Sequence, residues 1–105
     1  MLEKAAIGFS AMGSEARLSV LKCLVRAGEP GLTVGEIQAR TDIAPSTLAH
    51  HLKFLAAGGL VVQTRNGRSV VTRADFSQLK ELARFILSEC CDDTNISNLK
   101  VANDG

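Results

Sequence analysis

Residues 60–73, LVVQTRNGRSVVTR, constrain the fold of this chain more than any other segment. Two β-prone runs flank Asn66 and Gly67. An Asn-Gly pair between such runs is the strongest short-range signal of a β-hairpin. Helical signals lie on both sides of this segment, so the hairpin must be accommodated within a mostly α-helical fold.

The first third of the chain carries three helical signals. Residues 3–12 carry apolar residues at mixed spacing and predict a short helix. Ser14 is placed as the N-cap of a second helix, which ends at Gly28. Thr33 is followed three residues later by Glu36, which predicts a capping box at the start of another short helix.

Two further helices flank the hairpin. Pro45 suits the first turn of a helix that runs to a Gly-Gly pair, and the last helix begins at Asp75 or Ser77 and extends to the cysteine pair SECC. Helix, short turn, helix and two-stranded ribbon follow one another in the order of a winged helix-turn-helix. The sequence therefore predicts this fold for residues 1–91, followed by a polar, flexible tail in residues 92–105.

Length and composition agree with a single soluble domain. The chain has 105 residues, of which 46% are hydrophobic and 22% charged. It has neither a signal-peptide pattern at its start nor the roughly 20 consecutive apolar residues that span a bilayer. Three cysteines without framework spacing fit a reducing compartment. We therefore expect a cytoplasmic protein without membrane contact.

The charges are segregated along the chain, although the net charge is only +1. No acidic residue lies between Asp42 and Asp75, whereas both histidines and four basic residues do: Lys53, Arg65, Arg68 and Arg73. The middle of the chain is therefore its basic part.

A helical wheel of residues 45–57 separates an apolar face from a polar one. Leu48, Leu52 and Leu55 fall together and are expected to face the core. The opposite face carries Ser46, Thr47, His50 and Lys53. Residues at the front of such a second helix contact base edges in the major groove of DNA, so these four are candidate DNA-binding residues.

The two adjacent histidines, His50 and His51, point about 100° apart on this helix and cannot hold one ion without other ligands. No cysteine or carboxylate follows at helical spacing, and no neighbour is placed to orient an imidazole for acid-base catalysis. His51 lies on a flank, where its ring packs. The sequence thus predicts neither a metal site on this helix nor an enzyme.

Arg65 and Arg68 bracket the expected turn of the hairpin and are further candidate DNA-binding residues, because guanidinium groups suit phosphates and narrow minor grooves. Two solvated arginines also occur on hairpins without a partner. The chain has no Trp or Tyr to stack on unpaired bases, which favours duplex over single-stranded DNA.

The segments STLAHHLKFLAAGGLVVQTRNGRSV and MGSEARLSVLKCL resemble the ArsR family of bacterial metalloregulatory repressors. The resemblance covers about residues 2–91. It implies a homodimer joined through the first and last helices that represses an operator until an inducer releases it. The segment TVGEIQAR lacks the Cys-x-Cys of many arsenic sensors in this family, and the last helix lacks the histidines of its zinc and nickel sensors.

Cys90 and Cys91 resemble the vicinal cysteines of family members that sense trivalent arsenicals or antimony. Thiolates select soft ions, and two neighbouring sulfurs can chelate one centre. The wheel places Cys90 on an apolar stripe at the expected dimer interface, together with Leu79, Leu82, Ala83 and Ile86. The expected inducer is therefore arsenite, antimonite or an organoarsenical, with no cofactor required, and Cys23 is a candidate third ligand. Core packing is the competing interpretation for Cys90 and Cys23.

The alternative is a redox or persulfide sensor that pairs Cys23 with Cys90 or Cys91, as in other relatives that this chain resembles. The negative charges of Glu89 and Asp92, together with the helix C-terminus, argue against it, because they raise a thiol pKa and slow oxidation.

Overall fold

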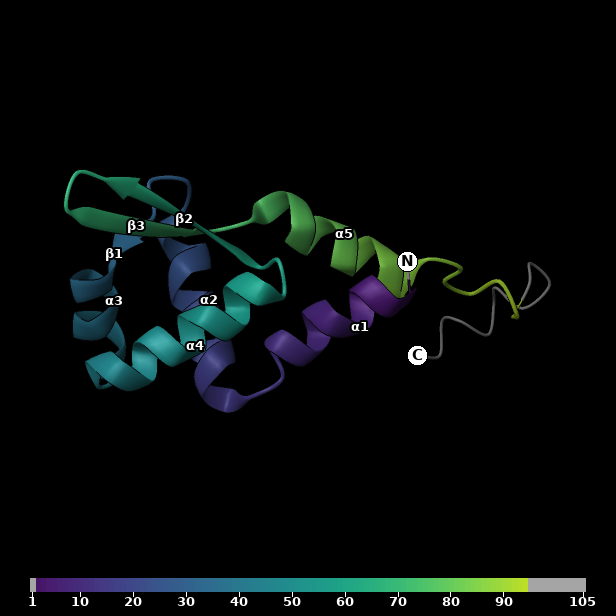
Figure 1. The fold of residues 1–105 in the computed structure, drawn as a ribbon. Coiled ribbons are helices and arrows are strands. Elements are labelled where there is room, and N and C mark those ends of the chain that lie inside the picture. The colour runs from purple at the N-terminus through teal and green to yellow at the C-terminus, as the bar shows by residue number, and fades with distance from the viewer. Residues whose placement is uncertain (1, 95–105) are drawn as a thin grey trace.

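The structure is a computed structural model that describes residues 2–94. The elements follow in the order α1 (Leu2–Ala11), α2 (Glu15–Ala27), β1 (Leu32–Thr33), α3 (Val34–Thr41), α4 (Pro45–Ala57), β2 (Val61–Asn66), β3 (Ser69–Ala74) and α5 (Phe76–Leu87). The sheet lies over α2, α3 and α4 at one end of the molecule, and α1 and α5 lie together at the other (Figure 1). The predicted winged helix-turn-helix is confirmed.

The predicted helix caps form. The Ser14 Oγ accepts a hydrogen bond of 3.0 Å from the Arg17 amide at the start of α2. At α3, the Glu36 amide donates to the Thr33 side chain and the Thr33 amide donates to the Glu36 carboxylate, which completes the capping box. The Asp75 carboxylate caps α5 by accepting from the Gln78 amide at 3.0 Å, so Asp75 rather than Ser77 begins this helix.

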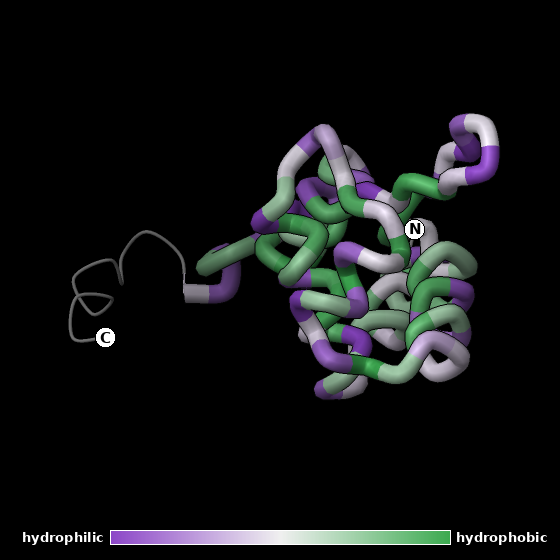
Figure 2. The backbone as a smooth tube through the Cα atoms, turned by 90° about the vertical axis from the view of Figure 1, so that its left-hand side faces the viewer, coloured by the Kyte–Doolittle hydropathy of each residue, from purple (hydrophilic) through white to green (hydrophobic). Residues whose placement is uncertain are grey.

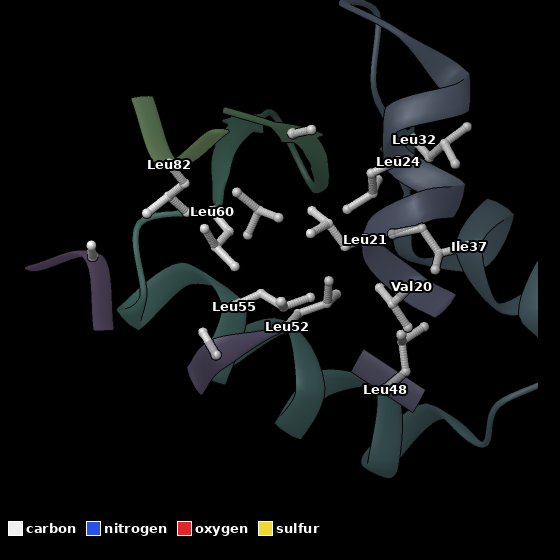
Figure 3. Packing of buried hydrophobic residues seen from close by; sticks show 14 residues of the cluster. Val20, Leu21, Leu24, Leu32, Ile37, Leu48, Leu52, Leu55, Leu60 and Leu82 are labelled. Atoms are coloured by element: carbon white, nitrogen blue, oxygen red, sulfur yellow. The ribbon is translucent and has the colours of Figure 1, made fainter. Parts of the chain in front are cut away.

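Leucines from α2 and α4 form the centre of the core, seen in close-up in Figure 3. The most deeply buried side chains, each with almost no exposed surface, are Val20, Leu24, Ile37, Leu48, Leu55, Leu60 and Thr72. Thr72 is the one polar side chain among them, and its hydroxyl accepts a hydrogen bond from the Gln63 amide group at 3.2 Å. A polar group that is buried but bonded in this way costs the fold little.

The sheet has three strands in the order β1-β3-β2, one more than the predicted two-stranded ribbon. The added strand is only two residues long, with Leu32 opposite Thr72 and Thr33 opposite Val71. A strand of this length leaves no alternating pattern in the sequence. Thr33 is also the N-cap of α3, and the capping pattern in the sequence predicts the start of a helix here rather than a strand.

The hairpin turn lies one residue later than predicted. Asn66 pairs with Ser69, so the turn consists of Gly67 and Arg68. Gly67 has a φ of +67°, as in turns that take glycine at the first central position. In the predicted register the turn would place Arg65 directly opposite Arg68, and like charges in that position repel. In the observed register, Arg65 lies opposite Val70.

The last helix ends earlier than predicted, at Leu87. The backbone leaves the helical conformation at Ser88, whose hydroxyl donates to the Phe85 carbonyl at 2.8 Å. The acidic residues beyond Ser88 would extend a helix against its own dipole. The predicted helical stripe through Cys90 is therefore wrong, because Cys90 and Cys91 lie in successive turns after α5. Of the predicted tail, residues 95–105 lie outside the described residues.

Helices α1 and α5 approach each other closely at Gly8. A Cβ atom at this position would lie 2.9 Å from a methyl carbon of Leu82, so any other residue would force the end of the Leu82 side chain to shift. The packing buries Leu82 but leaves Ile86 exposed on the outer side of α5. Within residues 2–94, the helices are all too short or too polar to cross a membrane.

Candidate DNA interface

Helix α4 presents one polar face to solvent. Leu48, Leu52 and Leu55 are buried as predicted, and this orientation fixes the opposite side of the helix. The predicted DNA-binding residues of α4 are all exposed: Ser46, Thr47, His50 and Lys53. The structure therefore brings the four together on one accessible helix face.

The start of α4 differs from that of α2, α3 and α5. Its N-cap is Ala44, which provides no side-chain hydrogen bond, and Pro45 has no amide hydrogen. No acidic residue lies in the first turn. The positive end of this helix dipole is thus left without an anion or a side-chain acceptor, beside the hydroxyls of Ser46 and Thr47.

A stack of three side chains holds the middle of α4. The Phe54 ring meets the His50 ring edge-on, with centroids 5.0 Å apart, and the Arg17 guanidinium carbon lies 4.8 Å from the Phe54 centroid. Arg17 also donates hydrogen bonds to the carbonyls of Ala11 at 2.6 Å and Ser10 at 3.3 Å. Arg17 therefore ties the end of α1 to the side chain that orients His50.

Sequence reasoning missed Arg17 as a positioning residue. One signal was present, since Phe54 falls outward on the helical wheel and an exposed aromatic ring needs a partner. The ring leans on α2 and α1.

His51 lies on the flank of α4 and is half-buried, as predicted. Its Nδ1 atom is buried and has no hydrogen-bond partner in the described part of the chain. The ring centroids of His50 and His51 are 6.5 Å apart. Residues 2–94 contain no group of three or more His, Cys, Asp or Glu side chains that could hold a metal ion.

Both wing arginines are exposed. Arg65 lies on β2 and Arg68 in the turn. The hydrophilic tip of the hairpin projects from the body of the molecule in Figure 2. The tip and the first turn of α4 lie at the same end of the molecule, away from α5 (Figure 1). This end is therefore built from an exposed helix face and a basic ribbon.

The three cysteines occupy two separate environments. Cys90 and Cys91 are exposed, and their Sγ atoms are 3.3 Å apart. The hydrogen bond to Cys91 and the charge of Cys91 raise the pKa of the Cys90 thiol, and slight desolvation and the charge of Asp92 add to the rise. Cys23 lies on α2, half-buried against the core. No group of three metal ligands forms in residues 2–94, so the single chain does not bring Cys23 to the pair.

Comparison with known proteins agrees with this geometry. A family model described as a helix-turn-helix domain matches residues 12–64. The transcriptional activator HlyU of Vibrio cholerae is 30% identical over 83 residues, which cover 79% of this chain and 74% of HlyU. An ArsR-like transcriptional regulator from Rhodococcus sp. RHA1 superposes with a TM-score of 0.72 at 26% identity, over 88% of this chain and 83% of that one. The chain belongs to the ArsR family of winged helix-turn-helix transcriptional regulators.

Two further solved structures share the fold over most of their length. HlyU of Vibrio cholerae has a TM-score of 0.67 and 28% identity, over 85% of this chain and 94% of that one. The homodimeric winged helix-turn-helix DNA-binding domain from Mycobacterium bovis has a TM-score of 0.65 and 28% identity, over 84% of this chain and 82% of that one. This ArsR-family chain is accordingly a DNA-binding transcriptional regulator and not an enzyme.

Proposed function

We propose that this ArsR-family regulator is a homodimeric repressor of a palindromic operator, and that a trivalent arsenical bound by Cys90 and Cys91 releases it from DNA. The observation that carries the proposed inducer is the pair of exposed sulfurs 3.3 Å apart at the end of α5.

The polar face of α4 supports the proposed DNA contacts. Ser46, Thr47 and His50 lie on the first half of the exposed face, where a recognition helix meets base edges. The uncapped start of α4 suits a backbone phosphate. Lys53 and the wing residues Arg65 and Arg68 add phosphate contacts, which hold the helix in register.

Exposed apolar side chains of α1 and α5 support the proposed homodimer. Four large side chains there are more than half exposed: Leu2 by 72%, Ile7 by 52%, Ile86 by 64% and Leu87 by 63%. A small monomer rarely leaves such a group in water, and a second copy would cover it. The homodimeric neighbour from Mycobacterium bovis supports the same assembly.

The chemistry of the cysteine pair favours a mono-organic arsenical such as methylarsenite. Its two hydroxyl groups leave as water as each thiol of Cys90 and Cys91 gives up its proton and forms an arsenic–sulfur bond. Both sulfurs are exposed and adjacent, so little rearrangement is needed. Inorganic arsenite needs a third sulfur to be fully bound by thiolates, and Cys23 is separated from the pair in the single chain.

Operator release measured by fluorescence anisotropy tests the proposal. Methylarsenite, arsenite and zinc are titrated into the complex of the protein with its labelled operator. We expect methylarsenite to lower the DNA affinity about 5–150-fold, the range of typical allosteric coupling. Cys90→Ser and Cys91→Ser should each bind DNA normally and lose the response, because serine keeps the shape without the soft ligand. Cys23→Ser is the matched control, and it should change only a response to arsenite.

A redox or persulfide signal is the second candidate, and one observation favours it. A structure of HlyU, which resembles this chain at 27% identity, is described as the reduced protein. If an oxidant or a persulfide donor releases the operator and arsenicals do not, the arsenical proposal is wrong. If this release is lost when Cys23 is replaced and also when Cys90 or Cys91 is replaced, the two cysteines that are needed form the sensing pair.

A further inference from the structure

Three cationic side chains surround a hollow between α2 and the end of α3, whose lining includes none of the proposed DNA-binding residues and neither Cys90 nor Cys91. The hollow has a volume of about 540 Å³. Its lining consists of Ser19, Lys22, Cys23, Arg26, Arg40 and Thr41. Cations and hydroxyl or thiol groups form this wall, and no carboxylate is part of it.

The three cations lack acidic partners. Within residues 2–94 the ion pair that forms is Arg84 with Glu81 on α5, and none of the three cations takes part in a hydrogen bond or ion pair there. Positive groups held around one hollow repel each other and attract anions. The Ser19 hydroxyl is likewise without a hydrogen bond in the described part of the chain, whereas the Thr41 hydroxyl donates to the Ile37 carbonyl at 2.8 Å.

Helix dipoles explain part of this cluster. Arg26 lies in the last turn of α2 and Arg40 in the last turn of α3, where each offsets the negative end of its own helix. This effect does not account for Lys22, which lies in the middle of α2. It also does not explain why two helices place their cations around the same space.

We propose that this hollow binds a phosphoryl group, held by Lys22, Arg26 and Arg40, with the Ser19 hydroxyl as an additional donor. Guanidinium groups match the oxygens of a phosphate through paired hydrogen bonds, and lysine adds a point charge. The phosphoryl group belongs either to the DNA backbone or to a small phosphorylated molecule. Arg40 lies shortly before α4 in the chain, so an anion here fixes the end of α3, and with it the start of α4, against α2.

Cys23 offers a direct reporter of occupancy, because its half-buried thiol lines the same hollow. The experiment uses the full chain with Cys90→Ser and Cys91→Ser, so its result does not depend on the proposed arsenical site. Alkylation of Cys23 by iodoacetamide, a neutral reagent, is followed by mass spectrometry. Inorganic pyrophosphate is added at constant ionic strength, with sodium chloride as the screening control.

We expect pyrophosphate, but not chloride, to slow the alkylation. At about ten times the dissociation constant the rate should fall roughly tenfold, since only the free form reacts. Lys22→Gln and Arg40→Gln should each abolish this protection. Both side chains are exposed, so the fold should survive, and circular dichroism verifies that. Lys80→Gln on α5 is the matched control and should keep the protection.

A second arm identifies the source of the phosphoryl group. Random duplex DNA replaces pyrophosphate in the same assay. If DNA but not pyrophosphate slows the alkylation, and this protection is lost in Arg40→Gln and kept in Lys80→Gln, the hollow binds the DNA backbone. Protection by pyrophosphate with the same dependence assigns it to a free anion. If neither slows the alkylation of Cys23, or if Lys22→Gln and Arg40→Gln remain protected, the proposal is wrong.

Discussion

Helices α4 and α5 have similar lengths and each buries one face against the core, yet the surfaces they leave exposed differ. Helix α4 leaves hydroxyls, an imidazole and an ammonium group in water beside the half-exposed Phe54 ring, whereas α5 exposes the large apolar side chains Ile86 and Leu87 at its end, after a charged stretch. Polar groups on an exposed helix suit a charged, hydrated groove. Apolar groups suit another protein surface. The two helices therefore indicate two kinds of partner at opposite ends of one small domain.

The largest expected effect comes from making the exposed face of α5 resemble that of α4. Ile86→Glu should convert the proposed homodimer to a monomer, because it places a charge in an apolar interface. Operator affinity should fall by at least about 100-fold, since two linked recognition helices lose their combined binding. Analytical ultracentrifugation and anisotropy measure the two effects. Lys80→Glu, also exposed on α5, is the control and should remain dimeric. A stable Ile86→Glu monomer that still binds tightly would contradict the comparison.

The next largest effect is expected when the imidazole is removed from the exposed face of α4. His50→Ala should cost about 1–3 kcal/mol at the cognate operator and much less on random duplex, as expected for a side chain near base edges. Lys53→Ala on the same face is the matched control and should weaken both equally, because a phosphate contact carries no sequence information. If His50→Ala lowers the affinity for both duplexes equally, His50 does not take part in base recognition.

A smaller effect distinguishes the wing from α4. Arg65→Ala and Arg68→Ala should each weaken binding on every duplex and reduce the salt dependence, by about one unit of the logarithmic slope. Affinities measured over a series of salt concentrations give the slopes. Thr64→Ala, an exposed and uncharged neighbour of Arg65 on β2, is the control and should leave the slope unchanged. An unchanged slope for both arginine variants would mean that the wing tip does not contact phosphate.

The part of the molecule that sequence reasoning predicted best is the helix-turn-helix. Its caps at Ser14 and Thr33 and its buried leucines depend on local hydrogen bonds and helical periodicity, which the sequence displays directly. Strand β1 and the hairpin register depend on pairing between distant residues. Local signals cannot fix such pairing, and the Asn-Gly motif placed the turn one residue early.

The candidate site divides in the same way. The exposure of Ser46, Thr47, His50 and Lys53 followed from one helical wheel, because α4 is regular over its whole length. The Arg17–Phe54 contact and the hollow around Cys23 join separate elements, so no single periodicity contains them. The position of Cys90 was wrong because the apolar stripe was extended past Ser88, where the helix stops.

The smallest expected effect is on the reactivity of Cys90, just after the end of α5. Helix α4 has no comparable pair of interacting sulfurs. Cys91→Ala should speed the alkylation of Cys90 at neutral pH, although it removes a thiol. Cys91 is the main cause of the raised pKa of Cys90, first through the hydrogen bond and then through its charge. Without it the pKa falls, and more of the thiol is ionised at any pH below that pKa. The alkylation rate should rise only about twofold to threefold, because the nucleophilicity of a thiolate falls with its pKa.

Asp92→Asn should also raise the alkylation rate of Cys90, but by less, since Asp92 is the weakest cause of the raised pKa. Site-resolved mass spectrometry over a pH series measures both rates. Slower alkylation of Cys90 in the alanine variant would show that Cys91 does not raise the pKa of Cys90.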